Sequence, residues 1–242
     1  MKTLLLSDVH ANVVALEAIW AKESDADRIY CAGDLVDWGP FPREVIAWMQ
    51  AHDVIGVRGN HDDVVIKRAR SGEAAAARAA CEAGGEITWM DHNASLLTET
   101  EIAYLEALPL ARPIEIDGVT YGLTHLYRGY EEIVSLAVFD EFSRTLFPGA
   151  AGGERVKRMI FGHTHRQAIR HLAEDRLWLN PGSISYRRPD DPDQTAHYAL
   201  IEDGRLSLKR LDYDRRPVMD AVVATRLTTE CTRSVWFFGD RK

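Results

Sequence analysis

The chain alternates short apolar runs with longer stretches in which apolar residues recur every three or four positions. Apolar runs at 4–7, 29–32 and 54–57 predict buried strands, and the periodic stretches at 12–22 and 43–51 predict helices between them. Strands joined by helices in this order pair in parallel through right-handed crossovers. The N-terminal part of the chain therefore predicts parallel strands with helices between them.

The pattern changes twice further along the chain. Residues 61–110 have a helical period, with Ile102, Leu105 and Leu108 forming one stripe. Beyond Ile114 strand patterns dominate, and Asp-Gly pairs at 117–118 and 203–204 predict hairpin turns. Strand-like runs follow at 119–123, 158–161, 167–172, 176–179, 197–201 and 206–211, with a helix predicted at 139–146. We expect an α/β fold in which two mixed sheets pack together with helices outside.

Five of the predicted strands are each followed directly by a segment that contains Asp, Asn or His. A single Gly-Asp after a strand is ordinary turn chemistry, but ligands bind in the crevice at the carboxyl ends of strands in open α/β sheets. Carboxylate, amide and imidazole groups are ligands for divalent metals. In the D-x-H and H-x-H pairs an extended backbone would place both side chains on one face. The polar segments are 8–10, 34–37, 60–62, 124–125 and 163–165.

These segments carry motifs in a fixed order. D-x-H at 8–10, G-D-x-x-D at 33–37, G-N-H-D at 59–62, a lone His125 and G-H-x-H at 162–165 resemble the calcineurin-like metallophosphoesterase superfamily. N-P-G-S at 180–183 and R-R-P at 187–189 resemble its bacterial phosphodiesterase branch. The resemblance implies a four-layer α/β/β/α sandwich of two mixed sheets flanked by helices.

The resemblance also implies a dinuclear metal centre. Asp34 would bridge two divalent ions, with Asp8, His10 and His165 completing one site and Asn60, His125 and His163 the other. Mn²⁺ is the expected metal, with Fe²⁺ or Zn²⁺ as alternatives, because four of the ligands are imidazoles. His61 would donate a proton to the leaving oxygen, and Asp37 would orient its imidazole.

Two positions depart from the family pattern. The protein-phosphatase branch has Arg after the second acid of G-D-x-x-D, whereas this chain has Trp38, and His125 is followed by Leu126 in place of Gly. Substrate contacts must therefore come from elsewhere, and the candidates are Arg128, Arg187 and Arg188. The aromatic residues Trp38, Phe41 and Tyr186 could stack on a base or an aryl leaving group, or could equally belong to the core or rim.

Two features allow more than one interpretation. His92 follows no strand, so we expect a polar surface or helix-end histidine in preference to a metal ligand. Residues 127–157 form an insertion between His125 and His163, which is either a lid over the site or a surface excursion.

Composition restricts the partners. With 242 residues, 46% hydrophobic and 27% charged, the chain suits one domain spanning 1–242. A formal net charge of −8 argues against a long nucleic acid as partner, whereas small anionic substrates stay compatible because bound metals reverse the charge locally.

Three scattered cysteines favour a reducing cytoplasm, and no stretch approaches the roughly 20 apolar residues of a membrane span. The oligomeric state leaves no signal in the sequence.

We therefore predict a dinuclear metal-dependent phosphoesterase that hydrolyses phosphodiester bonds of small or nucleotide-type substrates by metal-activated hydroxide. One alternative is a dinucleoside polyphosphate hydrolase, which would cleave a phosphoanhydride. Another is a non-catalytic scaffold with the same fold. Scaffolds of this kind usually lose ligands or the G-N-H histidine, and this chain has all seven ligand positions and His61.

Overall fold

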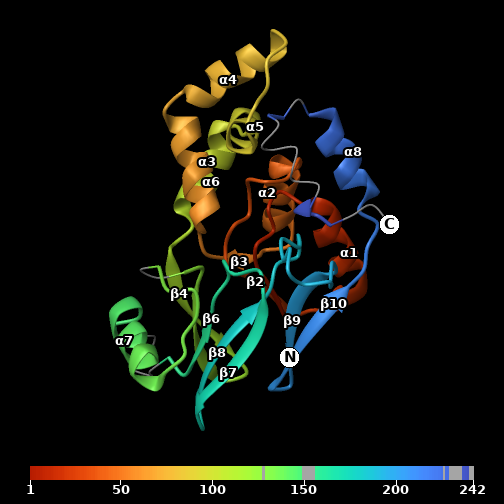
Figure 1. Ribbon diagram of the computed structural model, residues 1–242. Helices are drawn as coiled ribbons and strands as arrows, with labels where there is room; N and C mark the ends of the chain where they lie inside the picture. Colours follow the sequence, from red (N-terminus) through yellow and green to blue (C-terminus); the bar gives the residue numbers. More distant parts are fainter. Residues whose placement is uncertain (127–128, 149–155, 226, 229–235, 240–242) are drawn as a thin grey trace.

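A computed structural model describes residues 1–126, 129–148, 156–225, 227–228 and 236–239, and contains two five-stranded sheets that pack face to face (Figure 1). The first sheet has the order β10-β9-β1-β2-β3, with bounds Arg205–Leu211, Ala196–Glu202, Lys2–Leu6, Arg28–Cys31 and Ile55–Gly56. The second has the order β4-β5-β6-β8-β7, with bounds Ala111–Ile116, Val119–Thr124, Arg158–Ile160, Arg176–Pro181 and Gln167–Ala173.

Both sheets are mixed, as predicted. β1, β2 and β3 pair in parallel, and β9 adds antiparallel to β1. In the second sheet β5, β6 and β8 are parallel, and β4 and β7 add antiparallel at the edges. Both predicted Asp-Gly turns are confirmed, since they join β4 to β5 and β9 to β10.

Alternation along the strands divides the core into layers. Leu4 and Leu6 of β1 pack toward the helices, whereas Leu5 between them packs into the core shared by the two sheets. The helices on this face are α1 (Val13–Glu23) and α2 (Pro42–Ala51), both at predicted positions. The Asn12 side chain accepts a hydrogen bond from the backbone N–H of Ala15, which caps α1.

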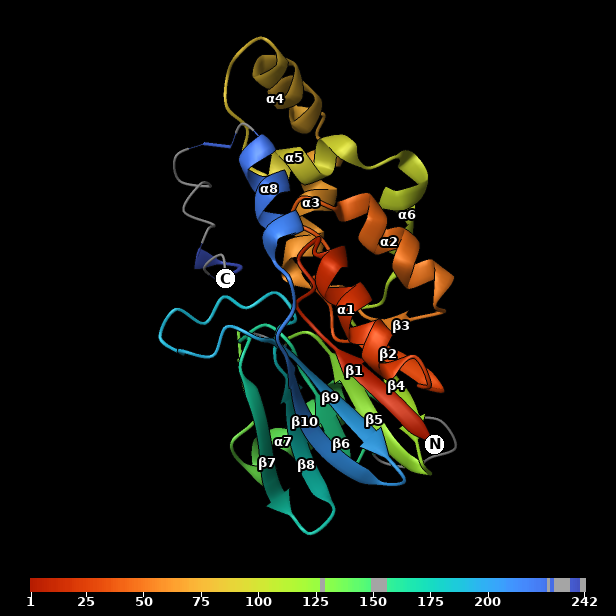
Figure 2. The same ribbon diagram turned by 90° about the vertical axis from the view of Figure 1, so that its right-hand side faces the viewer.

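The opposite face of the second sheet is covered by α7 (Leu136–Leu146). Phe139 and Phe142 of this helix are buried against Met159, Phe161 and Trp178. Each such buried aromatic contributes about 1.5–3 kcal/mol by removal from water. The α7 helix of the 127–157 insertion therefore forms the outer helix layer, and the predicted α/β/β/α order is confirmed (Figures 1 and 2).

Further helices gather beyond one end of both sheets (Figures 1 and 2). Four of them form the predicted helical region, namely α3 (Asn60–Arg70), α4 (Glu73–Glu82), α5 (Trp89–Leu96) and α6 (Glu99–Ala107). The fifth, α8 (Arg216–Ala224), was not predicted, and it packs with Trp89 and Phe237 into a separate apolar cluster. This cluster brings the C-terminal part of the chain to the same end.

The position of His92 differs from both predicted locations, the polar surface and a helix end. The residue lies within α5 and is only 8% exposed, because its ring packs against Trp89 at a centroid distance of 5.8 Å. His92 belongs to neither of the candidate metal-binding groups among the described residues. Within the same residues, every helix is too short or too polar to cross a membrane.

Candidate dinuclear metal centre

The seven predicted ligand positions meet where strands of both sheets end. Parallel strands present their carboxyl ends at one edge of a sheet, and two packed sheets place these edges together. The side chains follow β1, β2, β3, β5 and β6, and they are Asp8, His10, Asp34, Asn60, His125, His163 and His165. Five of them are buried, whereas Asn60 and His163 are partly exposed.

One group of ligand atoms comes from Asp8, His10 and His165. His165 Nε2 lies 3.2 Å from His10 Nε2 and 3.3 Å from Asp8 Oδ1. The other nitrogen of His165, Nδ1, donates a hydrogen bond to the carbonyl of Tyr186 at 3.0 Å. The neutral imidazole therefore turns its lone pair toward Asp8 and His10, which is the orientation of a metal ligand.

A second group comes from Asn60, His125 and His163. Asn60 Oδ1 lies 3.0 Å from His125 Nε2 and 3.0 Å from His163 Nδ1. His125 Nδ1 donates to the carbonyl of Ala32 at 2.7 Å. Nε2 is then the nitrogen that faces the Asn60 oxygen and is left to bind a metal ion once it is deprotonated.

Asp34 lies between the two groups. Its Oδ2 is 3.1 Å from His125 Nε2 and 3.8 Å from His10 Nε2, and it is buried without a well-formed hydrogen bond. Its Oδ1, in contrast, accepts from the backbone N–H of His61 at 2.9 Å. One oxygen is thus anchored, and the other is left for an ion.

Asp8 is a competing candidate for the bridge. A ligand atom of Asp8 lies within 4.8 Å of ligand atoms of His10 and His165. Asp8 also forms such a group with Asp34 and His125. However, both carboxylate oxygens of Asp8 accept hydrogen bonds, from the Ser7 hydroxyl at 2.6 Å and from the His163 N–H at 3.1 Å. Asp34 Oδ2 has no such partner, which favours Asp34 as the shared ligand.

The electrostatics of the cluster fit divalent cations. Burial lowers the pKa of His10 and lowers that of His165 to about 3, so both rings are neutral and able to bind metal. Burial likewise raises the pKa of Asp8 to about 6. Burial would lower the pKa of His125, but the charge of Asp34 and its contact with the ring, the charge of Asp8 and the Ala32 carbonyl together outweigh burial and raise that pKa to about 10. Buried carboxylates and acceptor atoms that face one another repel, and bound cations would offset this repulsion. The residues present therefore fit the metals that the resemblance implies.

The backbone of the ligand segments differs from the expected extended form. Asp8 and His10 have φ of 53° and 48°, and His163 and His165 have φ of 73° and 59°. These are left-handed conformations, which non-glycine residues rarely adopt and which concentrate at functional sites. The paired ligands therefore come from tight turns, and the predicted strand period does not account for their common orientation.

Hydrogen bonds from the N-P-G-S segment and from Ser185 hold these turns. The Ser183 and Ser185 hydroxyls donate to the carbonyls of Asp8 and Val9 at 2.9 and 2.6 Å. The Asn180 amide donates to the carbonyl of Gly162 at 2.6 Å. The segment thus ties the D-x-H turn to the G-H-x-H turn, which the sequence alone did not reveal.

Close packing around Asp34 requires glycine at position 59. A Cβ on Gly59 would collide with the Asp34 carboxylate, and the Gly59 N–H donates to Asp62 Oδ2 at 2.8 Å. Asp62 is fully buried, and its other oxygen accepts from the N–H groups of Leu35 and Val36. The G-N-H-D motif therefore also fixes the loop that follows Asp34.

His61 and Asp37 form the predicted pair. His61 Nδ1 lies 2.8 Å from Asp37 Oδ2, and the His61 ring meets the His10 ring edge-on at 5.1 Å. Burial would lower the pKa of His61, but the hydrogen bond to Asp37 and the charges of Asp34 and Asp37 outweigh it and raise the pKa. These groups therefore favour the protonated form of the imidazole beside the ligand cluster.

Asn93 is a supporting residue that the sequence analysis missed. This fully buried side chain of α5 accepts from the Asp37 N–H at 3.0 Å and donates to the Gly39 carbonyl at 2.9 Å. It fixes the turn that carries Asp37, which has φ of 69°. The signal available in the sequence was a polar residue within the predicted helical region. Its hydrogen-bond partners could not be identified from residue spacing.

The three candidate arginines have different positions. Arg187 is partly exposed, and its guanidinium lies over the rings of Trp38 and Phe237 at 5.5 and 6.0 Å. Arg188 is 1% exposed and donates to the backbone carbonyls of residues 165, 183, 186, 193 and 195, so its guanidinium is already used within the fold. Arg128 lies outside the described residues.

The three candidate stacking residues also differ in position and exposure. Trp38 is partly exposed and stacks on Phe237 with ring centroids 5.5 Å apart and an interplanar angle of 3°. Tyr186 is buried, and its hydroxyl donates to the Arg188 carbonyl at 2.9 Å, so it belongs to the core. Phe41 packs against the apolar cluster around α8. Trp38 lines a cavity of about 310 Å³.

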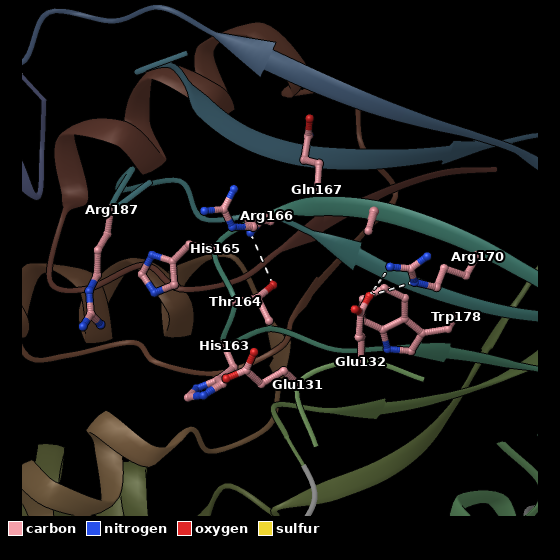
Figure 3. Close-up of a pocket in the computed structure, with 11 residues that line it drawn as sticks. Glu131, Glu132, His163, Thr164, His165, Arg166, Gln167, Arg170, Trp178 and Arg187 are labelled. Carbon is pink, nitrogen blue, oxygen red and sulfur yellow. Dashed lines mark hydrogen bonds and ion pairs between the residues drawn. The ribbon is translucent and has the colours of Figure 1, made fainter. Parts of the chain in front are cut away.

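A cavity of about 560 Å³ opens beside the G-H-x-H turn (Figure 3). Its walls are mainly charged, with Arg166 paired to Asp190, Arg170 paired to Glu132, and Arg187 beside His165. Glu132 belongs to the segment before α7, so part of the 127–157 insertion borders the site. A cavity of this size and polarity suits a small anionic ligand.

Two mixed sheets with imidazole and carboxylate groups at their common edge define an α/β protein with groups that could hold metal ions. The model of the calcineurin-like phosphoesterase superfamily domain matches residues 1–203, and the chain belongs to this superfamily.

Individual relatives extend over almost the whole chain. The uncharacterized protein MJ0912 of Methanocaldococcus jannaschii is 25% identical over 248 residues, covering 92% of each chain. A crystal structure of a metallophosphoesterase from Sphaerobacter thermophilus is 24% identical with a TM-score of 0.70, covering 98% of this chain and 100% of that one. The hypothetical protein PH1004 from Pyrococcus horikoshii is 17% identical with a TM-score of 0.75, covering 100% and 99%. These structures show the same fold.

Proposed function

We propose that this member of the superfamily is a dinuclear metal-dependent phosphodiesterase that acts on small or nucleotide-type substrates. The observation that carries the proposal is the position of Asp34 Oδ2, a buried oxygen without a well-formed hydrogen bond, lying 3.1 Å from His125 and 3.8 Å from His10. A carboxylate oxygen between two sets of ligands is the arrangement that two neighbouring cations require.

The metals would be held by two ligand sets. Asp8, His10, Asp34 and His165 would hold one ion, and Asp34, Asn60, His125 and His163 the other. When bound, two such ions polarise the phosphoryl oxygens and lower the pKa of an attacking water. Mn²⁺ is the proposed metal, since a site rich in imidazole discriminates against Mg²⁺.

The protein's own groups would complete the reaction. The oxygen of a water molecule that has lost one proton to solvent forms the new bond to phosphorus, and the ester bond breaks with its electron pair on the leaving oxygen. His61 supplies a proton to that oxygen, and Asp37 holds the imidazole in place through the 2.8 Å contact at Nδ1. Arg187, whose guanidinium is held over Trp38, would contact a phosphoryl oxygen.

The substrate class follows from the size and charge of the site. A 560 Å³ cavity admits a nucleotide-sized molecule, and the net charge of −8 disfavours a long nucleic acid. Trp38 stands where a second arginine would grip a dianionic monoester, which favours diesters. Cys31 and Cys81 are free thiols, which supports a cytoplasmic location.

A direct test combines metal analysis with a substrate panel. The chelated protein is reloaded with Mn²⁺, its metal content is measured, and turnover is followed on phosphodiesters, phosphomonoesters and dinucleoside polyphosphates. We expect about two ions per chain and highest kcat/KM on diesters. Preference for dinucleoside polyphosphates would favour phosphoanhydride cleavage, and loaded protein inactive on the whole panel would favour the scaffold. Asp34→Ala, which should be inactive in any divalent salt, serves as the control for contaminating activity.

A further inference from the structure

We propose that an apolar pocket beside His61 binds the leaving group of the substrate and selects a flat aromatic ring. This inference rests on the phosphodiesterase function proposed above. The pocket has a volume of about 310 Å³, and its walls include Trp38, Val64, Trp89 and Met90, with His61 and Asp37 at one side. It is separate from the charged cavity beside the G-H-x-H turn, with which it shares none of its lining residues.

The position of His61 links the pocket to the leaving group. The imidazole lines the pocket, and the same ring lies 5.1 Å from the His10 ring in the ligand cluster. A general acid must be within hydrogen-bond reach of the oxygen that it protonates. The group attached to that oxygen therefore leaves on the His61 side of the cluster, where this pocket is the adjoining space.

The walls determine the kind of group that fits. The partly exposed Trp38 ring and the side chains of Val64 and Met90 offer dispersion and edge contacts to an aromatic ring, and the buried Trp89 ring completes the apolar wall. Trp38 is fixed by its stack on Phe237 and by Arg187 on its face, so little ordering accompanies binding. A volume of 310 Å³ is at the lower end for ligand sites and admits one ring system.

The charged cavity offers the complementary environment. Arg166, Arg170 and Glu132 suit a polar ester group that stays on phosphorus. The two cavities thus give the substrate a direction, with the aromatic group leaving and the polar group retained. A nucleobase and a simple aryl ring share the chemistry that the pocket would recognise.

The test uses methyl phosphodiesters whose leaving groups have matched acidity, one phenolic and one a fluorinated alkyl alcohol. We expect kcat/KM to favour the aryl ester by about tenfold or more, because each methylene-sized contact changes binding by a factor of about four. Val64→Phe, which fills the pocket, and Met90→Ala, which removes a wall, should reduce this ratio several-fold. Val223→Ala on α8, at a residue that is 71% exposed and outside the pocket lining, should leave the ratio unchanged.

Binding measurements separate this inference from the proposed function. Titration calorimetry compares phenylphosphonate with methylphosphonate, and we expect tighter binding of the phenyl compound in the wild type but not in Val64→Phe. Adenosine and 4-nitrophenol, tested separately as inhibitors, distinguish a nucleobase from a simple aryl ring. Equal kcat/KM for the two esters, or a ratio that Val64→Phe leaves unaltered, would overturn the pocket assignment while diesterase activity stands. If no diester is hydrolysed, the proposed function fails, and the calorimetric comparison still decides whether the pocket binds a ring.

Discussion

Removing the His61 imidazole should harm the enzyme in proportion to how strongly the leaving oxygen needs a proton. In His61→Ala the backbone N–H that donates to Asp34 Oδ1 at 2.9 Å is retained. The metal ligands are untouched, because His61 contributes no atom to the two candidate groups. The variant therefore isolates proton donation from metal binding.

The expected loss can be bounded from the role of the group. General acid catalysis contributes about 10²–10⁴-fold, or roughly 3–5.5 kcal/mol of transition-state stabilisation. A nucleoside alkoxide departs poorly without a proton, so its release should slow by about 10²-fold or more. Nitrophenolate departs readily as an anion, and the variant should retain a measurable fraction of that activity.

Asp37→Asn should show the same dependence in a milder form. Asparagine keeps an oxygen for the Trp38 N–H, which donates to Asp37 Oδ1 at 2.8 Å, but it removes the charge that faces His61 Nδ1. A hydrogen bond to a charged group contributes about 1.5–3 kcal/mol, which sets the upper range of the loss. The effect should again be larger for the alkoxide leaving group.

The assay measures kcat and kcat/KM for both diesters, together with the metal content of each variant. His171→Ala, at an exposed residue of β7, is the matched control and should behave as wild type. Equal losses on both substrates would show that His61 positions the substrate. Loss of a metal ion from His61→Ala would show that it is a ligand, and either result would refute the general-acid role.

Three further predictions concern the metals, the substrate and pH. Asp34→Ala should lose metal and activity in any divalent salt, whereas Asp8→Asn should be partly restored by high Mn²⁺; equal rescue would show that Asp34 is not shared. Wild-type turnover of diesters should exceed that of monoesters with the same aryl leaving group, and the reverse preference would contradict the diesterase assignment. Burial lowers the pKa of His92 from 6.5 to about 4, so the unfolded state binds an extra proton between these values and stability falls as pH decreases through this range. Urea unfolding at pH 7 and pH 5 measures how much the free energy of unfolding decreases on acidification, and this decrease should be about 1–2 kcal/mol smaller in His92→Leu than in wild type. His171→Leu is the control. Equal decreases in all three proteins would refute burial of His92 as the cause.

The sequence by itself determined the layers and the convergence of the side chains proposed as ligands. The apolar run Leu4–Leu6 marks a buried strand, and each proposed ligand follows directly on a strand or its turn, as Asp8 follows β1. Because parallel strands end at one edge, local order was enough to predict that these side chains converge. The Asp-Gly turns fixed two hairpins for the same local reason.

Only the tertiary structure decided how the site is held and bounded. Arg187 and Arg188 are neighbours in sequence, yet one lies over Trp38 while the other is buried among carbonyls, because the left-handed turn at Arg187 separates their directions. Asn93 and Phe237 reach the site from distant parts of the chain, and no residue spacing records such contacts. Sequence patterns report the period of local structure, whereas left-handed ligand turns and pocket walls depend on long-range hydrogen bonds and packing that form only when the layers assemble.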